Sequence, residues 1–386
     1  MEPMVPAESV RLLDDDVLTL VAESSQLAGR IHPILRESMG DLVRSMNCYY
    51  SNLIEGHNTL PVDIDRALAG DFSEDKKKRD LQLEARAHIE VQRMIDRGEA
   101  LSPAVSIEFL LWVHKEFCAR LPEDLLIVEN PGSGKKITVV PGELRGHHVR
   151  VGQHIPPDPD DLTAFLSRFT EAYGSSFLST LRKVIGVAAS HHRLLWIHPF
   201  LDGNGRVTRL FSHAWLRELG VGSELWSVSR GLARNVDEYK SRLAAADGRR
   251  RGDRDGRGNL TQAGLEAFCQ FFLSTCVDQV VFMEKLLEPS ELLRRMEIWT
   301  EEETRARRLP RCSWPLLREA VVTGEFARGR APDLTGYETR QARTVLNTLI
   351  DKGYLVSKTT RSPVRLGFPM EVVDRWFPRL YIASPG

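Results

Sequence analysis

The sequence lacks several features that would assign it to a common class of protein. It has only five cysteines in 386 residues and no CxxC pair, which argues against a zinc site and against a disulfide framework. Its formal net charge is −1, so a uniformly basic surface is excluded, although a local basic patch is not. No apolar run approaches the roughly 20 residues of a membrane span. The acidic N-terminus MEPMVPAESVRLLDDD does not resemble a signal peptide. We therefore expect a reduced, cytoplasmic protein with no membrane partner.

Amphipathic helical patterns, in contrast, run through most of the chain. Its length suits two or three domains. Apolar residues at helical spacing, with capping and breaking residues at the ends, predict helices over 8–46, 80–97, 103–120, 177–196, 204–219 and 260–287. Turn residues and β-branched pairs within 128–156 predict short strands or a hairpin. The Arg- and Gly-rich stretch 247–258 is expected to be a loop, and 288–310 a charged helical connector. The chain is therefore predicted to be mainly α.

The last part of the chain, 311–386, carries most of the basic charge. It has 12 Lys or Arg against 7 Asp or Glu, a net of +5. Predicted helices at 315–322, 331–335 and 337–351 precede two strands around a turn, which is the order of a winged helix. Such a domain contacts DNA or docks a protein, including a second copy of the chain, and the sequence leaves both open. The basic side chains available for DNA are Arg340, Arg343, Lys358, Arg361 and Arg365.

The stretch WIHPFLDGNGRVTR, residues 196–209, combines residue types that are unfavourable in a packed core. It joins two predicted core helices, and the second begins near Asn204. A helix N-terminus offers unpaired N–H groups and the positive end of the helix dipole, which together bind anions. Gly203 and Gly205 allow the backbone to approach phosphate closely. Arg206 and Arg209 are three residues apart, so both project from the same side of the helix.

Two further residues of this stretch add chemistry. Asp202 is a hard oxygen ligand, and one carboxylate together with substrate phosphates is a common way to hold Mg²⁺. His198 has an ordinary pKa of about 6.5, so it can accept a proton near neutral pH. The alternative is a structural corner between two helices with a buried histidine. The combination of all these residues at these spacings favours a site that holds a polyphosphate beside a base.

The same residues carry a family resemblance. HPFLDGNGRVTR resembles the Fic-family signature HPFx(D/E)GNGRxxR at every fixed position. Residues 141–157 resemble the flap hairpin of that family, and residues 229–243 resemble the helix that follows the motif. The resemblance covers roughly residues 40–285. It implies a Fic-type helical core with a small β-hairpin flap, placed before the C-terminal winged helix.

The activity that this resemblance implies is transfer of AMP from ATP to a hydroxyl group of a Ser, Thr or Tyr side chain of a target protein, and of the chain itself. His198 would then be the general base, and Asp202 would hold Mg²⁺. The phosphates would be bound by Gly203, Asn204, Gly205, Arg206 and Arg209, with Asn204 contributing its side chain and Arg209 contacting the γ-phosphate. The adenine side would be formed by Asn235 and Tyr239, although Lys240 departs from the Tyr-Tyr pair that the family often has there. The target would dock at the flap, and homodimer formation stays open.

A second motif lies far upstream, in CYYSNLIEGHNTL, residues 48–60. Ser51 and Glu55 are four residues apart and share a face of a helix that ends at Gly56. This resembles the family's inhibitory helix, (S/T)xxxE(G/N). The resemblance implies that Glu55 pairs with Arg209, displaces the γ-phosphate and restrains transfer. It leaves open whether Glu55 also supports the removal of AMP.

The predicted organisation has four parts: an N-terminal helical region 1–100 with the inhibitory motif at 51–56, a catalytic core 101–287, the connector 288–310 and the winged helix 311–386. Within the core lie the flap, 138–155, and the motif, 198–209. The rival interpretation is a regulator that binds DNA through 311–386 and uses the core as a nucleotide sensor. Donors such as UTP also stay open, because base recognition lies outside the motif.

Overall fold

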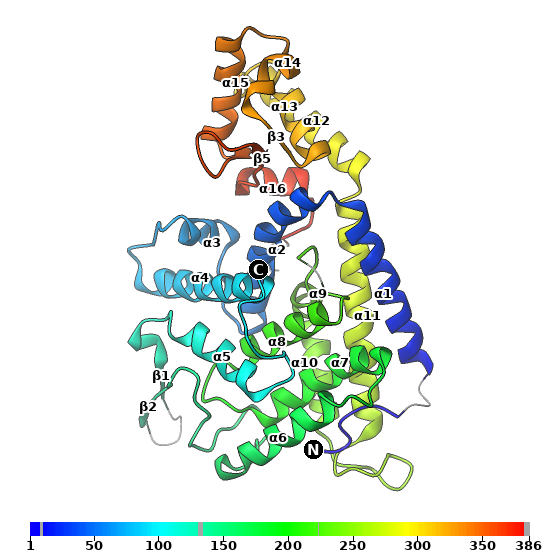
Figure 1. The fold of residues 1–386 in the computed structure, drawn as a ribbon. Helices are drawn as coiled ribbons and strands as arrows, with labels where there is room; N and C mark the ends of the chain where they lie inside the picture. The colour runs from blue at the N-terminus through cyan, green and yellow to red at the C-terminus, as the bar shows by residue number, and fades with distance from the viewer. Residues whose placement is uncertain (8–10, 130–133, 223, 382–386) are drawn as a thin grey trace. The chain divides into compact units, whose positions relative to one another are not determined.

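The computed structural model describes residues 1–7, 11–129, 134–222 and 224–381. The chain divides into two compact units. The first unit contains Met1–Ser24 and Asn47–Val280, and the second contains Ser25–Met46 and Val281–Gly386. The helices of the predicted N-terminal region 1–100 are divided between these two units. Figure 1 follows the elements along the chain by colour.

The first unit is almost entirely helical. Three long helices contribute residues to both units: α1 (Arg11–Arg30), α2 (Pro33–Ile54) and α11 (Gln262–Leu286). The other helices of the first unit are α3 (Pro61–Leu68), α4 (Lys76–Asp96), α5 (Ile107–Cys118), α6 (Leu162–Tyr173), α7 (Thr180–Ile197), α8 (Asn204–Glu218), α9 (Val228–Arg234) and α10 (Val236–Ala246). Of these, α4, α5, α7 and α8 match ranges predicted from hydrophobic periodicity, as do α1, α2 and α11. The segment 229–243 differs, since it is split at Asn235, whose backbone (φ −120°, ψ 39°) is not helical.

The helices α7 and α8 pack against each other in the middle of this unit. The apolar face of α7 is buried, including Val184, Ile185 and Ala188. Gly186 lies on the same helix, and a Cβ atom there would stand 3.1 Å from the Trp215 ring of α8. This close approach fixes the two helices against each other. The turn between them, residues 198–203, is therefore held by a rigid frame.

The β structure of the first unit is small. Strands β1 (Ile127–Glu129) and β2 (Lys136–Thr138) form an antiparallel pair in which Val128 lies opposite Ile137. The range predicted for the flap, 138–155, contains the end of β2 and one isolated bridge between Val151 and His154. The strands of the predicted hairpin thus lie mainly before that range. Residues 142–157 form an extended loop that is fixed by side-chain contacts.

Helix α11 is long and apolar enough to cross a membrane by length and composition. In the structure, 56% of its most apolar window is buried inside the protein. Its fully buried residues include Phe268, Phe272 and Leu273. Core helices of globular proteins are often as long and as apolar as this one. The burial of these side chains accounts for the apolar character of α11.

The second unit combines helices with a three-stranded antiparallel sheet. Its elements are α12 (Pro289–Arg305), α13 (Ser313–Thr323), β3 (Glu325–Phe326), α14 (Ala331–Thr335), α15 (Thr339–Asp351), β4 (Leu355–Val356), β5 (Val364–Leu366) and α16 (Met370–Trp376). The strand order is β3-β5-β4. The three helices and two strands predicted for 311–386 are present, but the sequence analysis missed β3 and α16. Trp376 of α16 is fully buried and packs edge-on against Trp299.

Candidate active site

The turn between α7 and α8 begins at His198. This residue ends α7 in the left-handed conformation (φ 52°, ψ 61°), and its N–H donates to the carbonyl of Leu194 at 3.0 Å. Pro199 follows and prevents the helix from continuing. Burial lowers the pKa of His198 to about 4, although a hydrogen bond to the backbone of Leu195 favours the charged form. The ring is therefore neutral at pH 7 and can accept a proton.

The side chain of Asn204 closes the turn. Its Oδ1 accepts from the N–H of Phe200 at 2.9 Å, and its Nδ2 donates to the carbonyl of the same residue at 2.8 Å. Both polar ends of the amide are thus used inside the turn, and the residue is 4% exposed. In this conformation Asn204 can reach a phosphate through its backbone N–H rather than through its side chain. The side-chain contact implied by the resemblance does not fit this geometry.

The first turn of α8 presents an anion-binding end. Gly203 is the N-cap in the left-handed region (φ 78°), and no side chain caps the helix there. Glu55 lies directly over Gly205, because a Cβ atom at that glycine would collide with Oε1 of Glu55. The carboxylate of Glu55 thus lies where the helix dipole and the N–H groups favour a negative charge.

The guanidinium group of Arg209 is bound by Ser51 of α2 and by Glu55, which directly follows that helix. Its Nη2 donates to Oε1 of Glu55 at 2.5 Å, and its Nε donates to Oγ of Ser51 at 2.8 Å. Arg209 is 2% exposed. Burial opposes ionisation of Glu55, but the charges of Arg209 and Arg206 outweigh it and hold the pKa of Glu55 below its ordinary value. The pairing of Glu55 with Arg209 that the resemblance implies is present in this geometry, whereas the contact of Ser51 with Arg209 was not predicted.

The first arginine of the motif, Arg206, pairs with a different carboxylate. Its Nη1 lies 3.1 Å from Oε2 of Glu84 on α4, and its Nη2 lies 3.7 Å from Oδ2 of Asp202. The guanidinium also stacks over the Phe117 ring, 4.9 Å from the centroid. Oε2 of Glu84 is also bonded to Nδ1 of His57 at 2.9 Å. Glu84 therefore fixes both the arginine and the segment that follows Glu55.

Asp202 lies at the open side of the turn. Its side chain is 53% exposed, and Arg206 is the ion-pair partner found for it. Among the described residues, no group of three or more His, Cys, Asp and Glu side chains could hold a metal ion. A magnesium ion at Asp202 would therefore take most of its ligands from substrate and water, as this ion commonly does. One exposed carboxylate, Asp202, is therefore compatible with the predicted Mg²⁺.

Arg145 joins the flap region to the turn. It is 4% exposed. Its Nε donates to the carbonyl of His198 at 2.8 Å, and its other nitrogens donate to the carbonyls of His147 at 3.0 Å and Pro157 at 2.6 Å. The start of the same loop is fixed to α5, because the N–H of Gly142 donates to Nδ1 of His114 at 2.9 Å. The flap region and the backbone of His198 are thus joined by part-buried hydrogen bonds.

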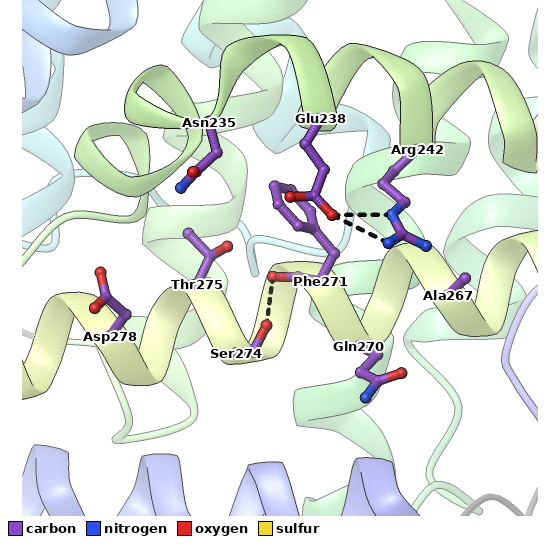
Figure 2. Close-up of a pocket in the computed structure, with 9 residues that line it drawn as sticks. All are labelled: Asn235, Glu238, Arg242, Ala267, Gln270, Phe271, Ser274, Thr275 and Asp278. Carbon is purple, nitrogen blue, oxygen red and sulfur yellow. Dashed lines mark hydrogen bonds and ion pairs between the residues drawn. The ribbon is translucent and has the colours of Figure 1, made fainter.

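The two residues predicted for the adenine side lie elsewhere. Tyr239 is 2% exposed, and its hydroxyl group is 2.7 Å from Nε2 of His191. It is a core residue, so an adenine ring cannot reach it in this conformation. Asn235 lines an open pocket of about 400 Å³ between α10 and α11, together with Glu238, Arg242, Ala267, Gln270, Phe271, Ser274, Thr275 and Asp278 (Figure 2). No residue of 198–209 lines this pocket, so the geometry supports neither prediction.

Four residues of the site were not predicted from the sequence: Glu84, His57, His114 and Arg145. A signal for the first was present, because the buried stripe of α4 carries Gln82, His88 and Gln92 among its apolar residues. Polar residues on a buried face need partners and often mark a polar site. Nothing in the local sequence of Arg145 distinguishes it from an exposed arginine of a loop.

Comparison with known proteins identifies the domain. Residues 104–216 match the model of the Fic/DOC family. The chain is 29% identical over 220 residues to a protein named protein adenylyltransferase Fic from Drosophila yakuba. That alignment covers 55% of this chain and 41% of the relative, so the chain spans less than half of its length. The chain thus contains a Fic domain, as the motif predicted.

Solved structures support the same fold. A Fic family protein from Desulfovibrio desulfuricans G20 matches 92% of this chain and 96% of its own with a TM-score of 0.50 and 19% identity. Fic-1 (residues 134–508) from C. elegans matches 73% of this chain and 74% of its own with a TM-score of 0.52 and 17% identity. At these identities the likeness concerns the fold, and it confirms a mainly helical Fic-type fold with a small sheet.

Proposed function

We propose that this protein is an adenylyltransferase that moves AMP from ATP to a hydroxyl group of a protein side chain. The main support for this proposal is that three features occur together at the turn between α7 and α8. These are a neutral histidine, His198, the uncapped N-terminus of α8, and two buried arginines on its first turns. The names of the relatives support the same chemistry.

In the proposed reaction, the backbone of Gly203 and Gly205 and the side chains of Arg206 and Arg209 bind the phosphates of ATP. His198 takes the proton of the target hydroxyl group. The oxygen forms a bond to the α-phosphorus, the bond from that phosphorus to the bridging oxygen breaks, and pyrophosphate leaves with the electron pair. Positioning and charge stabilisation supply most of the catalysis.

Asp202 would hold Mg²⁺, which neutralises charge on the phosphates. The target segment is proposed to dock along 142–157, where Val151 and Ile155 are 44% and 71% exposed. An extended loop with exposed apolar side chains can accept another extended chain as an added strand. Arg145 would then keep the docked segment close to His198.

We also propose that Glu55 restrains this activity. Its carboxylate lies at the anion-binding end of α8 and accepts a hydrogen bond from the guanidinium of Arg209. The γ-phosphate of ATP would bind the same guanidinium. Two anions at this place repel each other, so ATP binds productively only when Glu55 moves away. The inhibition is thus a competition between a side chain of the protein and a phosphate group.

The experiment is intact mass spectrometry after incubation with Mg²⁺ and ATP. The Glu55→Gly variant should gain the mass of one or more AMP groups, and wild type should gain far less. The double variant Glu55→Gly/His198→Ala is the control and should gain none. Peptide mapping then identifies the modified Ser, Thr or Tyr. Equal labelling of wild type and Glu55→Gly would contradict the restraint, and labelling that persists without His198 would contradict the proposed base.

Two extensions of the same assay address the donor and the reverse reaction. Replacing ATP by UTP tests whether the base of the nucleotide matters. Modified Glu55→Gly protein, freed of ATP and mixed with unlabelled wild type, tests the removal of AMP. Loss of the label only when Glu55 is present in the mixture would show that this carboxylate supports removal.

A further inference from the structure

Helix α15 in the second unit (Figure 1) has one buried face and one exposed face. Its buried stripe consists of Ala342, Val345, Leu346 and Leu349. The opposite stripe consists of Arg340, Arg343, Thr344 and Asn347, all of which are exposed, with Gln341 beside them. These positions follow the i, i+3, i+4, i+7 spacing of one helix face. The exposed face is therefore a continuous polar stripe on a helix that is fixed by its apolar side.

The charge of this stripe is positive and unbalanced. Among the described residues, Arg340 and Arg343 have no ion-pair partner, and residues 339–350 contain no Asp or Glu. Helix α12 of the same unit differs, since Arg294 pairs with Glu291 at 2.9 Å and Arg305 pairs with Glu301 at 2.9 Å. Within the sequence of α15 and its flanks, carboxylates stand only at the two ends, at Glu338 and Asp351.

A second basic element follows α15 directly. The loop between β4 and β5 carries Lys358 and Arg361, both exposed. Lys358 forms a long ion pair with Glu37, whose Oε1 lies 4.0 Å from Nζ. Arg365 of β5, which the sequence offered for DNA, pairs with the same carboxylate at 3.1 Å. Arg361 has no ion pair among the residues that the structure describes. A 13-residue helix is about 20 Å long, and the major groove of B-DNA admits such a helix.

We propose that the second unit binds duplex DNA, with the Arg340–Asn347 face of α15 in the major groove and the β4–β5 loop against the phosphates. Arg, Gln and Asn are the side chains that bond base edges there, and Thr serves phosphate or base. Duplex RNA is disfavoured because its major groove is too narrow for side chains to read. A protein partner is disfavoured because this stripe offers no aromatic or aliphatic anchor.

The test uses the full chain and a fluorescein-labelled DNA duplex of mixed sequence with about 30 base pairs. Anisotropy titrations are made between about 50 and 200 mM salt. The variant Arg340→Ala/Arg343→Ala removes two exposed side chains. The matched control, Arg294→Ala/Arg305→Ala, removes the same charge from α12. Thermal melting of both variants should match wild type, because all four side chains are on the surface.

The wild type should bind with an affinity that falls steeply with salt. The α15 variant should bind about tenfold or more weakly, and its log–log salt slope should decrease by about one for each phosphate that it no longer neutralises. The control should keep the slope of the wild type. Absence of binding at the lowest salt, or an equal decrease of affinity in both variants, would overturn the proposal. A change of self-association by the α15 variant without any DNA binding would instead assign this face to an interface between copies of the chain.

Discussion

Replacing Glu55 by glycine should increase the stabilisation that ATP gives to the protein. The carboxylate of Glu55 and a phosphate group compete for Arg209 and for the N-terminus of α8. A hydrogen bond to a charged group contributes about 1.5–3 kcal/mol. Since 33% of the Glu55 side chain is exposed, the lower part of that range applies, about 1.5–2 kcal/mol.

This free energy translates into a difference in affinity. At about 1.4 kcal/mol per factor of ten, ATP should bind Glu55→Gly roughly 10- to 30-fold more tightly than wild type. At an ATP concentration of about 100 times the Kd of the variant, binding stabilises the variant by about 2.7 kcal/mol and wild type by about 0.9–1.4 kcal/mol. For a unit of this size, the difference corresponds to roughly 3–7 °C in the shift of Tm.

The assay is differential scanning fluorimetry with and without ATP and Mg²⁺. Without ATP, Glu55→Gly should melt below wild type, because Arg209 is buried and would be left without its carboxylate. The shift caused by ATP is independent of that destabilisation, so it isolates the competition. The control is Glu238→Gln, which removes a carboxylate from an exposed pair with Arg242 and should behave as wild type. Equal shifts for wild type and Glu55→Gly would refute the reasoning.

Three further predictions follow from the same contacts. Ser51→Ala removes one of the side chains bound by Arg209 but leaves Glu55 in place, so labelling should rise less than in Glu55→Gly, as intact mass will show. Because burial lowers the pKa of His198 to about 4, the rate of Glu55→Gly should stay level between about pH 6 and 8 and fall only as the ring is protonated near pH 4; an inflection near 6.5 in the rate profile would contradict this. Glu84→Gln in the Glu55→Gly background should weaken ATP binding, measured by calorimetry, because the substitution removes the carboxylate that positions Arg206; unchanged affinity would remove Glu84 from the site.

The sequence predicted the parts of the fold that depend on local signals. The ends of α7 and α8 follow from Pro199 and Gly220, which act within a few residues. The short strand β3 (Glu325–Phe326) carries no alternating pattern, and it exists because β5 pairs with it. Pairing of this kind depends on the tertiary structure, so periodicity could not find it.

The same distinction applies to the site. The contact between Glu55 and Arg209 was predicted from two motifs, at 51–56 and 198–209. A family motif can indicate a long-range contact that the local sequence pattern does not. Glu84 belongs to no motif, and its position beside Arg206 follows only from the packing of α4 against α8. The prediction for Tyr239 shows the opposite case. The resemblance suggested a contact with the ligand, but the side chain is buried in the core.

The hydrogen bonds of Arg145 have a consequence for how the protein opens. One guanidinium group serves carbonyls at His147, Pro157 and His198. The loop 142–157 cannot leave its place without stranding these carbonyls or removing the arginine from all of them. Opening of the loop and release of the turn at His198 are therefore one cooperative event, and their amide protons should exchange with solvent at a common rate. A target segment bound to this loop would slow the opening. It would thereby keep His198 next to the hydroxyl group of the target.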